Sequence, residues 1–212
     1  MTRSSRLALA CSLVIALAAT SSANLLVDPG FEGGGGAAWN PYRSTTAFEF
    51  DFDNTDEVQD RLQSLRVDFS PMSSWQIFAA EQDITVLGGE DWYASVFAMT
   101  DISGAPAMQV YLETIFYSNS VEMVGMNLQS ASLTEATPQD VWQQLSVAGT
   151  TPIGADSARY RLIIFNTGEA VTGSGSVWFD QAFAAVPEPA TLSLLGLSSA
   201  LLLLLRRKTR SH

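Results

Sequence analysis

The chain has 212 residues, enough for one domain with a full-sized core once two apolar ends are set aside. Residues 24–186 hold 21 of the 22 acidic and five of the 11 basic residues, a net charge of −16 that argues against nucleic-acid binding. The only cysteine, Cys11, and the only histidine, His212, lie in the ends, so this segment can form no disulfide, cysteine nucleophile, Ser-His-Asp triad or histidine zinc site.

Residues 1–23 predict a cleavable signal peptide. Two arginines precede an apolar run over residues 7–19, and the small residues Ser21 and Ala23 follow. Signal peptidase accepts only small side chains at its site, so we expect cleavage between Ala23 and Asn24. A retained membrane anchor is the alternative, but 13 apolar residues are short for a full span.

The middle segment, residues 24–186, is a succession of short strand-like runs separated by turn residues. Residues 24–32 predict a short strand broken by the Pro29-Gly30 turn, and residues 51–57 predict an acidic loop. The clearest alternation of apolar and polar residues spans residues 108–117. Further strands are expected at 64–70, 75–80, 83–87, 91–100, 127–133, 142–147, 159–165 and 177–183. The pattern predicts an all-β domain, an antiparallel β-sandwich; a helical domain is the poor alternative.

The C-terminal end predicts a single transmembrane helix. Residues 190–205 carry no charge, and Arg206 and Arg207 follow at once. As a helix these residues would be roughly 24 Å long, a little short for a bilayer core. The basic residues after them place the tail in the cytoplasm, while the signal peptide directs the middle segment across the inner membrane.

Residues 186–192 read Val-Pro-Glu-Pro-Ala-Thr-Leu and lead into the apolar run and the basic end. Residues 187–212 as a whole closely resemble the PEP-CTERM sorting signal of Gram-negative bacteria. The resemblance implies recognition by an exosortase-type enzyme, with processing near Pro187, Glu188 and Pro189. It also implies delivery to the cell surface or the exopolysaccharide matrix. A simple single-pass anchor is the alternative.

The middle segment carries a second resemblance. The opening residues 24–32 with Trp39 are similar to the start of jelly-roll carbohydrate-binding modules of the galactose-binding-like superfamily. Later similarities are Ser64-Leu-Arg-Val, the turn from Gly88-Gly89 into Trp92-Tyr93, Trp142-Gln-Gln-Leu and Val177-Trp-Phe-Asp180. The resemblance implies a jelly-roll fold over residues 24–186.

The same resemblance implies one structural calcium ion, held by an acid after the first strand and an aspartate in the last strand. The matching residues here are Glu32 and Asp180, and backbone carbonyls would complete the oxygen shell that Ca²⁺ prefers. The alternative is that Asp180 caps a turn and Glu32 is solvated. The acidic run from Asp51 to Asp56 does not fit an EF-hand loop, which requires glycine at position six and glutamate at position twelve.

Five tryptophans raise the question of sugar stacking. Trp39, Tyr42 and Trp75 lie close to joints rich in glycine, proline or serine, so we expect these rings to be exposed and able to contact a glycan. Trp92, Trp142 and Trp178 begin or lie within strands, where burial in the sandwich is the usual outcome.

The sequence favours a non-catalytic cell-surface or extracellular-matrix protein whose domain associates with exopolysaccharide. A structural biofilm or adhesion protein without sugar specificity is the first alternative. A glycoside-active enzyme that uses paired carboxylates is the second; with 21 acidic residues in the segment, such pairs have little diagnostic value.

Overall fold

The computed structural model describes residues 23–33, 38–55, 57–59 and 62–186, and residues 24–186 form one compact unit. Within these ranges there is no helix, and therefore none long and apolar enough to cross a membrane. Residues 1–22 of the predicted signal peptide lie outside the described residues. So does the whole predicted sorting signal, with Pro187, Glu188, Pro189, Arg206 and Arg207.

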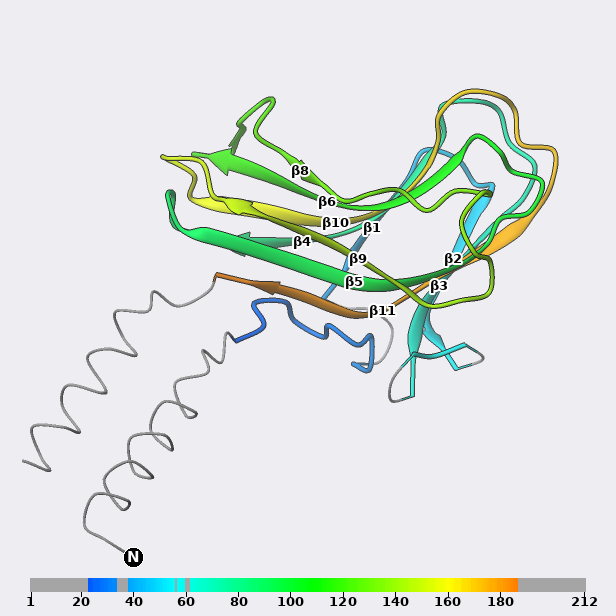
Figure 1. The fold of residues 1–212 in the computed structure, drawn as a ribbon, viewed down its shortest axis with the longest axis horizontal. Coiled ribbons are helices and arrows are strands. Elements are labelled where there is room, and N and C mark those ends of the chain that lie inside the picture. Colours follow the sequence, from blue (N-terminus) through cyan, green and yellow to red (C-terminus); the bar gives the residue numbers. More distant parts are fainter. Residues whose placement is uncertain (1–22, 34–37, 56, 60–61, 187–212) are drawn as a thin grey trace, which may run out of the picture. The chain divides into compact units, whose positions relative to one another are not determined.

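The domain consists of two antiparallel sheets packed face to face (Figure 1). One sheet has six strands in the order β1-β4-β10-β6-β7, with β8 also paired to β6, and the other has five strands in the order β2-β3-β11-β5-β9. The predicted antiparallel β-sandwich is therefore confirmed. The strands are β1 (Asn40–Arg43), β2 (Phe48–Asn54), β3 (Ser64–Phe69), β4 (Ile77–Thr85), β5 (Asp91–Asp101), β6 (Met108–Ser118), β7 (Val121–Glu122), β8 (Leu128–Gln129), β9 (Gln143–Thr150), β10 (Ser157–Asn166) and β11 (Gly175–Ala185).

The core lies between the sheets and follows the alternation seen in the sequence. On β6, Met108, Val110, Leu112 and Phe116 point inward and are fully buried. Because successive side chains of a strand point to opposite sides, Gln109, Tyr111, Glu113 and Ile115 lie on the outer side of the six-stranded sheet. This outer side has a small apolar cluster of its own, separate from the main core.

Several expected elements differ from the structure; the strand expected at 127–133, for example, is only the two-residue β8. The runs at 75–80 and 83–87 belong to one strand, β4, because its polar centre is satisfied by partners far away in sequence. Glu81 pairs with Arg161, and the amide of Gln82 exchanges hydrogen bonds with the backbone of Val27. The expected acidic loop at 51–57 is largely β2, an edge strand whose apolar residues Phe48 and Phe52 are buried.

Residues 24–32 form no regular strand, yet they bond to β11 as a strand would. Leu25 N–H donates to the Ala184 carbonyl (2.8 Å), and Ala182 N–H donates to the Pro29 carbonyl (2.7 Å). The Asn24 side chain donates to the Ala182 carbonyl and accepts from Ala184 N–H. This segment therefore lies beside the second half of β11, beyond the residues that β3 pairs.

Candidate functional site

The outer side of the six-stranded sheet carries a continuous array of aromatic and charged side chains. Antiparallel pairing brings residues of β1, β4, β10 and β6 into rows across the strands, and paired residues share a face. We call this set the outer array: Tyr42, Trp75, Ile77, Ala79, Glu81, Asp83, Tyr111, Glu113, Tyr117, Arg159, Arg161, Ile163 and Phe165.

One half of the outer array is apolar. Tyr42, Ala79, Ile163 and Tyr111 form one row across four strands. Ala79, Ile163 and Tyr111 are buried, and the partly buried Ile77 and Phe165 pack against them. Tyr42 is exposed at the edge of this row. We call this cluster, with Ile77 and Phe165, the apolar floor; the exposed phenol of Tyr42 borders it.

Trp75 stands beside this floor in a strained backbone conformation. Its indole ring lies 5.9 Å from the ring of Phe165, and the residue is 66% exposed. Its φ of 61° is in the left-handed region, which a bulky residue adopts only at a cost of about 1–3 kcal/mol. An exposed ring on a strained backbone contributes little to the stability of the fold, and such backbone strain is common at functional sites.

The loop that presents Trp75 is pinned by the buried Asn166. Its side-chain amide donates to the Ser73 carbonyl (3.0 Å), and its backbone N–H donates to the Gln76 carbonyl (2.8 Å). The Gln76 amide in turn donates to the Ser73 hydroxyl and the Ser74 carbonyl. The backbone that carries the indole is therefore fixed before any ligand arrives, which reduces the entropy lost on binding.

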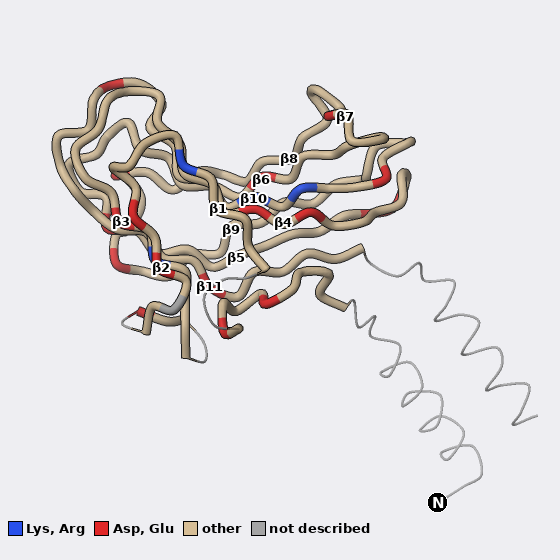
Figure 2. Tube along the Cα trace, turned by 180° about the vertical axis from the view of Figure 1, so that it is seen from behind, with Lys and Arg blue, Asp and Glu red and all other residues tan. Residues whose placement is uncertain are grey.

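The other half of the outer array is an ion-pair network. Arg161 bridges Glu81 (2.7 Å) and Glu113 (2.8 Å), which lie on the strands to either side of it. Arg159 makes a two-pronged contact with Asp83, with N–O distances of 2.7 and 3.1 Å, and approaches Glu81 at 3.5 Å. Figure 2 shows basic and acidic positions side by side along β10 and β4. These groups lie on the same side of the sheet as the apolar floor, where they can hydrogen-bond hydroxyl groups.

Three groups of the outer array keep their protons at neutral pH. Burial raises the pKa of the Tyr111 phenol, with the Glu113 charge adding to the effect. Burial likewise raises the pKa of Tyr117, and the hydrogen bond to Asp83 raises that of Arg159. These residues therefore act as hydrogen-bond donors there rather than as bases.

The exposure of the five tryptophans differs in part from what the sequence predicts. The expected exposure of Trp39 is wrong: it is 4% exposed, packs 5.0 Å from Phe31, and donates its indole N–H to the Asp28 carbonyl. That hydrogen bond satisfies the polar edge of the ring, so burial is favourable and Trp39 cannot stack on a glycan. The expected exposure of Tyr42 and Trp75 is confirmed. Of the three expected in the core, only Trp92 belongs to it. Trp178 is buried outside the core, with the Arg66 guanidinium 5.7 Å from its ring, and Trp142 is half-buried.

Glu32 and Asp180 approach the same loop from two sides. Glu32 accepts hydrogen bonds from the backbone N–H groups of Leu62 (2.9 Å) and Gln63 (3.1 Å). Asp180 is fully buried, and it accepts from the backbone N–H groups of Gln59 and Gln181. Among the described residues, no three acidic, histidine or cysteine side chains gather into a metal-binding group.

Asp28 adds a carboxylate to the loop that carries Glu32. Its Oδ2 atom is buried and has no hydrogen-bond partner. A buried carboxylate oxygen without a donor is unfavourable unless a cation or water satisfies it. Asp28 and Phe31 both adopt left-handed φ values, 50° and 59°, so the loop is tightly wound around this point. Asp28 does not join Glu32 and Asp180 in a metal-binding group of three acidic side chains.

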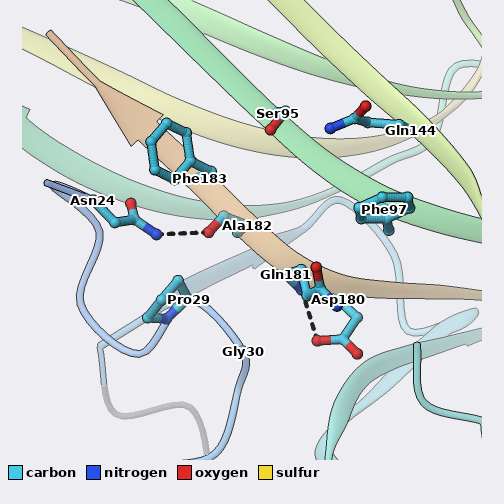
Figure 3. Close-up of a pocket in the computed structure, with 10 residues that line it drawn as sticks. All are labelled: Asn24, Pro29, Gly30, Ser95, Phe97, Gln144, Asp180, Gln181, Ala182 and Phe183. Carbon is cyan, nitrogen blue, oxygen red and sulfur yellow. Dashed lines mark hydrogen bonds between the residues drawn. The ribbon is translucent and has the colours of Figure 1, made fainter. Parts of the chain in front are cut away.

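A pocket of about 280 Å³ lies on the outer side of the other, five-stranded sheet (Figure 3). Phe97 and Phe183 lie on either side of Ser95, and Pro29 and Gly30 of the N-terminal segment close one border. The pocket is at the small end for a ligand site. Its rings are half-buried, and none of them is held out as Trp75 is, so we rank this pocket below the outer array.

Residues 185–208 match the PEP-CTERM protein-sorting motif. The chain carries a PEP-CTERM sorting signal. This motif indicates export and membrane-associated sorting, and it begins at the last residue of β11. No curated protein sequence matches the chain.

Many solved structures resemble the sandwich, and carbohydrate-binding modules are prominent among them. The CBM22-1 xylan-binding domain from Paenibacillus barcinonensis Xyn10C aligns with a TM-score of 0.54 and 15% identity, over 81% of this chain and 99% of that domain. TmCBM61, in complex with β-1,4-galactotriose, aligns with a TM-score of 0.52 and 13% identity, over 77% and 98%. The enzymatically active domain of bacteriophage CBA120 tailspike protein 4 gives 0.57 and 10%, over 77% of this chain and only 21% of that one. At these identities the likeness shows a fold shared with carbohydrate-binding modules.

Proposed function

We propose that the exported domain binds a neutral glycan across the outer array, without catalytic activity, at the cell surface or in the extracellular matrix. The observation that carries the proposal is Trp75, an exposed indole held in a strained conformation beside an apolar floor. A flat indole suits the apolar face of a sugar ring, and the Tyr42 phenol, 53% exposed, offers a second contact. The resemblance to carbohydrate-binding modules supports the same reading.

The charges of the domain favour a neutral glycan over an acidic one. In the outer array the carboxylates of Glu81, Asp83 and Glu113 outnumber the guanidinium groups of Arg159 and Arg161, and all five are already paired. The domain as a whole carries a strong negative charge. A polyuronate would therefore be repelled, whereas the hydroxyl groups of a neutral sugar can accept from the guanidinium N–H groups and donate to carboxylate oxygens.

Affinity electrophoresis tests this proposal. We expect the protein to be retarded in gels that contain a neutral polysaccharide, such as a xylan, a galactan or the producing strain's own neutral exopolysaccharide. We expect no retardation by alginate, which is a polyuronate. If no neutral polysaccharide retards the protein when calcium is present, glycan binding is wrong and a structural role without sugar specificity takes its place.

We also propose that one Ca²⁺ ion is held where Glu32 and Asp180 border the 57–63 loop, with backbone carbonyls completing its oxygen shell. Two carboxylates support the proposal, because Glu32 and Asp180 both bind the backbone of this loop and carry oxygen atoms of the type that Ca²⁺ prefers. When bound, the ion would fix the N-terminal segment and the 57–63 loop to β11. It would have no part in glycan chemistry.

Calcium at ten times its dissociation constant is expected to stabilise the domain by about 1.4 kcal/mol, since ligand binding to the folded state raises its stability. For a domain of this size this corresponds to a rise in melting temperature of roughly 3–6 °C, abolished by EGTA. Asp180→Asn should remove the calcium dependence, whereas the exposed Glu49→Gln should keep it. A midpoint that is the same in calcium and in EGTA would rule the site out.

A further inference from the structure

One end of the sandwich exposes apolar side chains on three neighbouring loops, which join β4 to β5, β6 to β8 through β7, and β9 to β10. Ile153 is 90% exposed and Val124 is 84% exposed, the two highest values among the large hydrophobic residues described. We call this set the apolar end: Leu87, Val121, Val124, Met126 and Ile153. Isolated exposed apolar residues are ordinary, but a group on adjacent loops indicates a contact surface.

The loops of the apolar end are tied to one another. Gly89 N–H donates to the Thr151 carbonyl (2.9 Å), and Val86 N–H donates to the Asp156 carbonyl (3.1 Å). Asp156 in turn accepts from Asn119 N–H with its carboxylate. A Cβ atom at Gly88 would lie 2.6 Å from the backbone nitrogen of Gly154, so the two loops touch backbone to backbone. The side chains therefore project from a fixed platform.

The chain leaves the domain at this same end. Ala185, the last residue of β11, pairs with Tyr93, and Asp91, at the start of the same strand β5, pairs with Thr150 at the foot of the β9–β10 loop. Figure 1 shows the end of β11 at the end of the sandwich that bears these loops. Ala190, where the uncharged stretch of the sorting signal begins, is four residues beyond Val186. Four extended residues span at most about 14 Å.

We propose that the apolar end docks onto the surface of a zwitterionic lipid bilayer while the sorting signal is still attached. The sorting signal directs the chain to a membrane, and the short connection keeps the domain close to that membrane. The apolar residues lie on the loops beside the connection. The loops hold Glu90, Glu122 and Asp156, and the described ranges 86–91, 119–127 and 150–157 hold no basic residue. Anionic lipid headgroups would therefore weaken the contact.

The test places an environment-sensitive fluorophore on the full chain, reconstituted in phosphatidylcholine vesicles, with Cys11→Ser as background. Single cysteines replace Ile153 and Val124 at the apolar end in separate proteins. In the control protein the single labelled cysteine replaces Val141, which is exposed at the opposite end of the same membrane-attached domain. We expect a blue-shifted emission and quenching by a spin-labelled lipid at positions 153 and 124, but not at 141. Adding phosphatidylglycerol should reduce the quenching.

Three outcomes would overturn the proposal. Equal accessibility to water at all three positions means that the apolar end does not touch lipid. Stronger quenching with phosphatidylglycerol contradicts the zwitterionic surface. The third outcome is that positions 153 and 124 are shielded from water only in cells that contain the processing enzyme, and not in vesicles. The apolar end would then bind a protein and not lipid. Matching melting temperatures of the three labelled proteins show that the probes leave the fold intact.

Discussion

Replacing Trp75 with glycine is expected to weaken glycan binding roughly 30-fold while leaving stability nearly unchanged. Truncation of an aromatic hot-spot residue costs about 2 kcal/mol of binding free energy or more, and each 1.4 kcal/mol is a factor of ten in affinity. Stability should stay within about 1 kcal/mol, because two effects oppose each other. Glycine relieves the strain of the left-handed φ of 61°, and it removes the ring contact with Phe165.

Isothermal titration with a neutral oligosaccharide, together with urea unfolding, measures both quantities. Trp142→Gly is a residue-matched control, since Trp142 adjoins β9 in the opposite sheet and is half-buried. It should lose stability through lost packing and keep its glycan affinity. Trp75→Gly with unchanged affinity would remove the outer array as the binding surface. If Trp75→Gly instead unfolds the domain, the indole is structural and the argument from strain fails.

The β-sandwich could be predicted because its signal is local. Alternation along β3 and β6 appears within a few residues of sequence, and the structure buries Leu65, Val67 and Phe69 on one side as expected. Strands with a polar interior were harder to predict. The centre of β4 reads as an interruption until Arg161 and the backbone of Val27 are known to lie beside it.

The tryptophans show most directly what could not be predicted from the sequence. Trp39 and Trp75 both lie near joints, and nothing local tells them apart. Burial of Trp39 depends on the Asp28 carbonyl and on Phe31 and Tyr160, whereas exposure of Trp75 depends on Asn166, 91 residues later in the chain. A positive φ at a tryptophan has no signature in the sequence.

The ion-pair network was missed for the same reason. Glu81, Glu113 and Arg161 lie far apart in sequence, and antiparallel register alone brings them into one row. The scarcity of basic residues was an available signal, because residues 24–186 hold only five arginines beside 21 acidic residues. Two of the five, Arg159 and Arg161, lie on one predicted strand and were candidates for specific ion pairs. The alternation of that strand places both on the same side, which is the outer one.

Replacing Arg161 with methionine is expected to destabilise the domain by about 3 kcal/mol, the lower end of the range for breaking a buried pair. The side chains of Glu81, Glu113 and Arg161 are 11%, 12% and 18% exposed, so removing the arginine leaves two poorly solvated carboxylates without their shared partner. Urea unfolding of the full chain measures the loss. Adding Glu81→Gln and Glu113→Gln to Arg161→Met should recover most of it, because the unpaired charges are then gone.

Arg159→Met is the matched control for this prediction. Arg159 is the neighbouring arginine on the same side of β10, but its side chain is 35% exposed and that of its partner Asp83 is 64% exposed. An exposed ion pair contributes about 0–1 kcal/mol, so Arg159→Met should cost far less than Arg161→Met. Equal losses for the two variants would mean that burial does not set the strength of this network. A triple variant no more stable than Arg161→Met would show that the methylene packing of Arg161, rather than its charge, holds the three strands together.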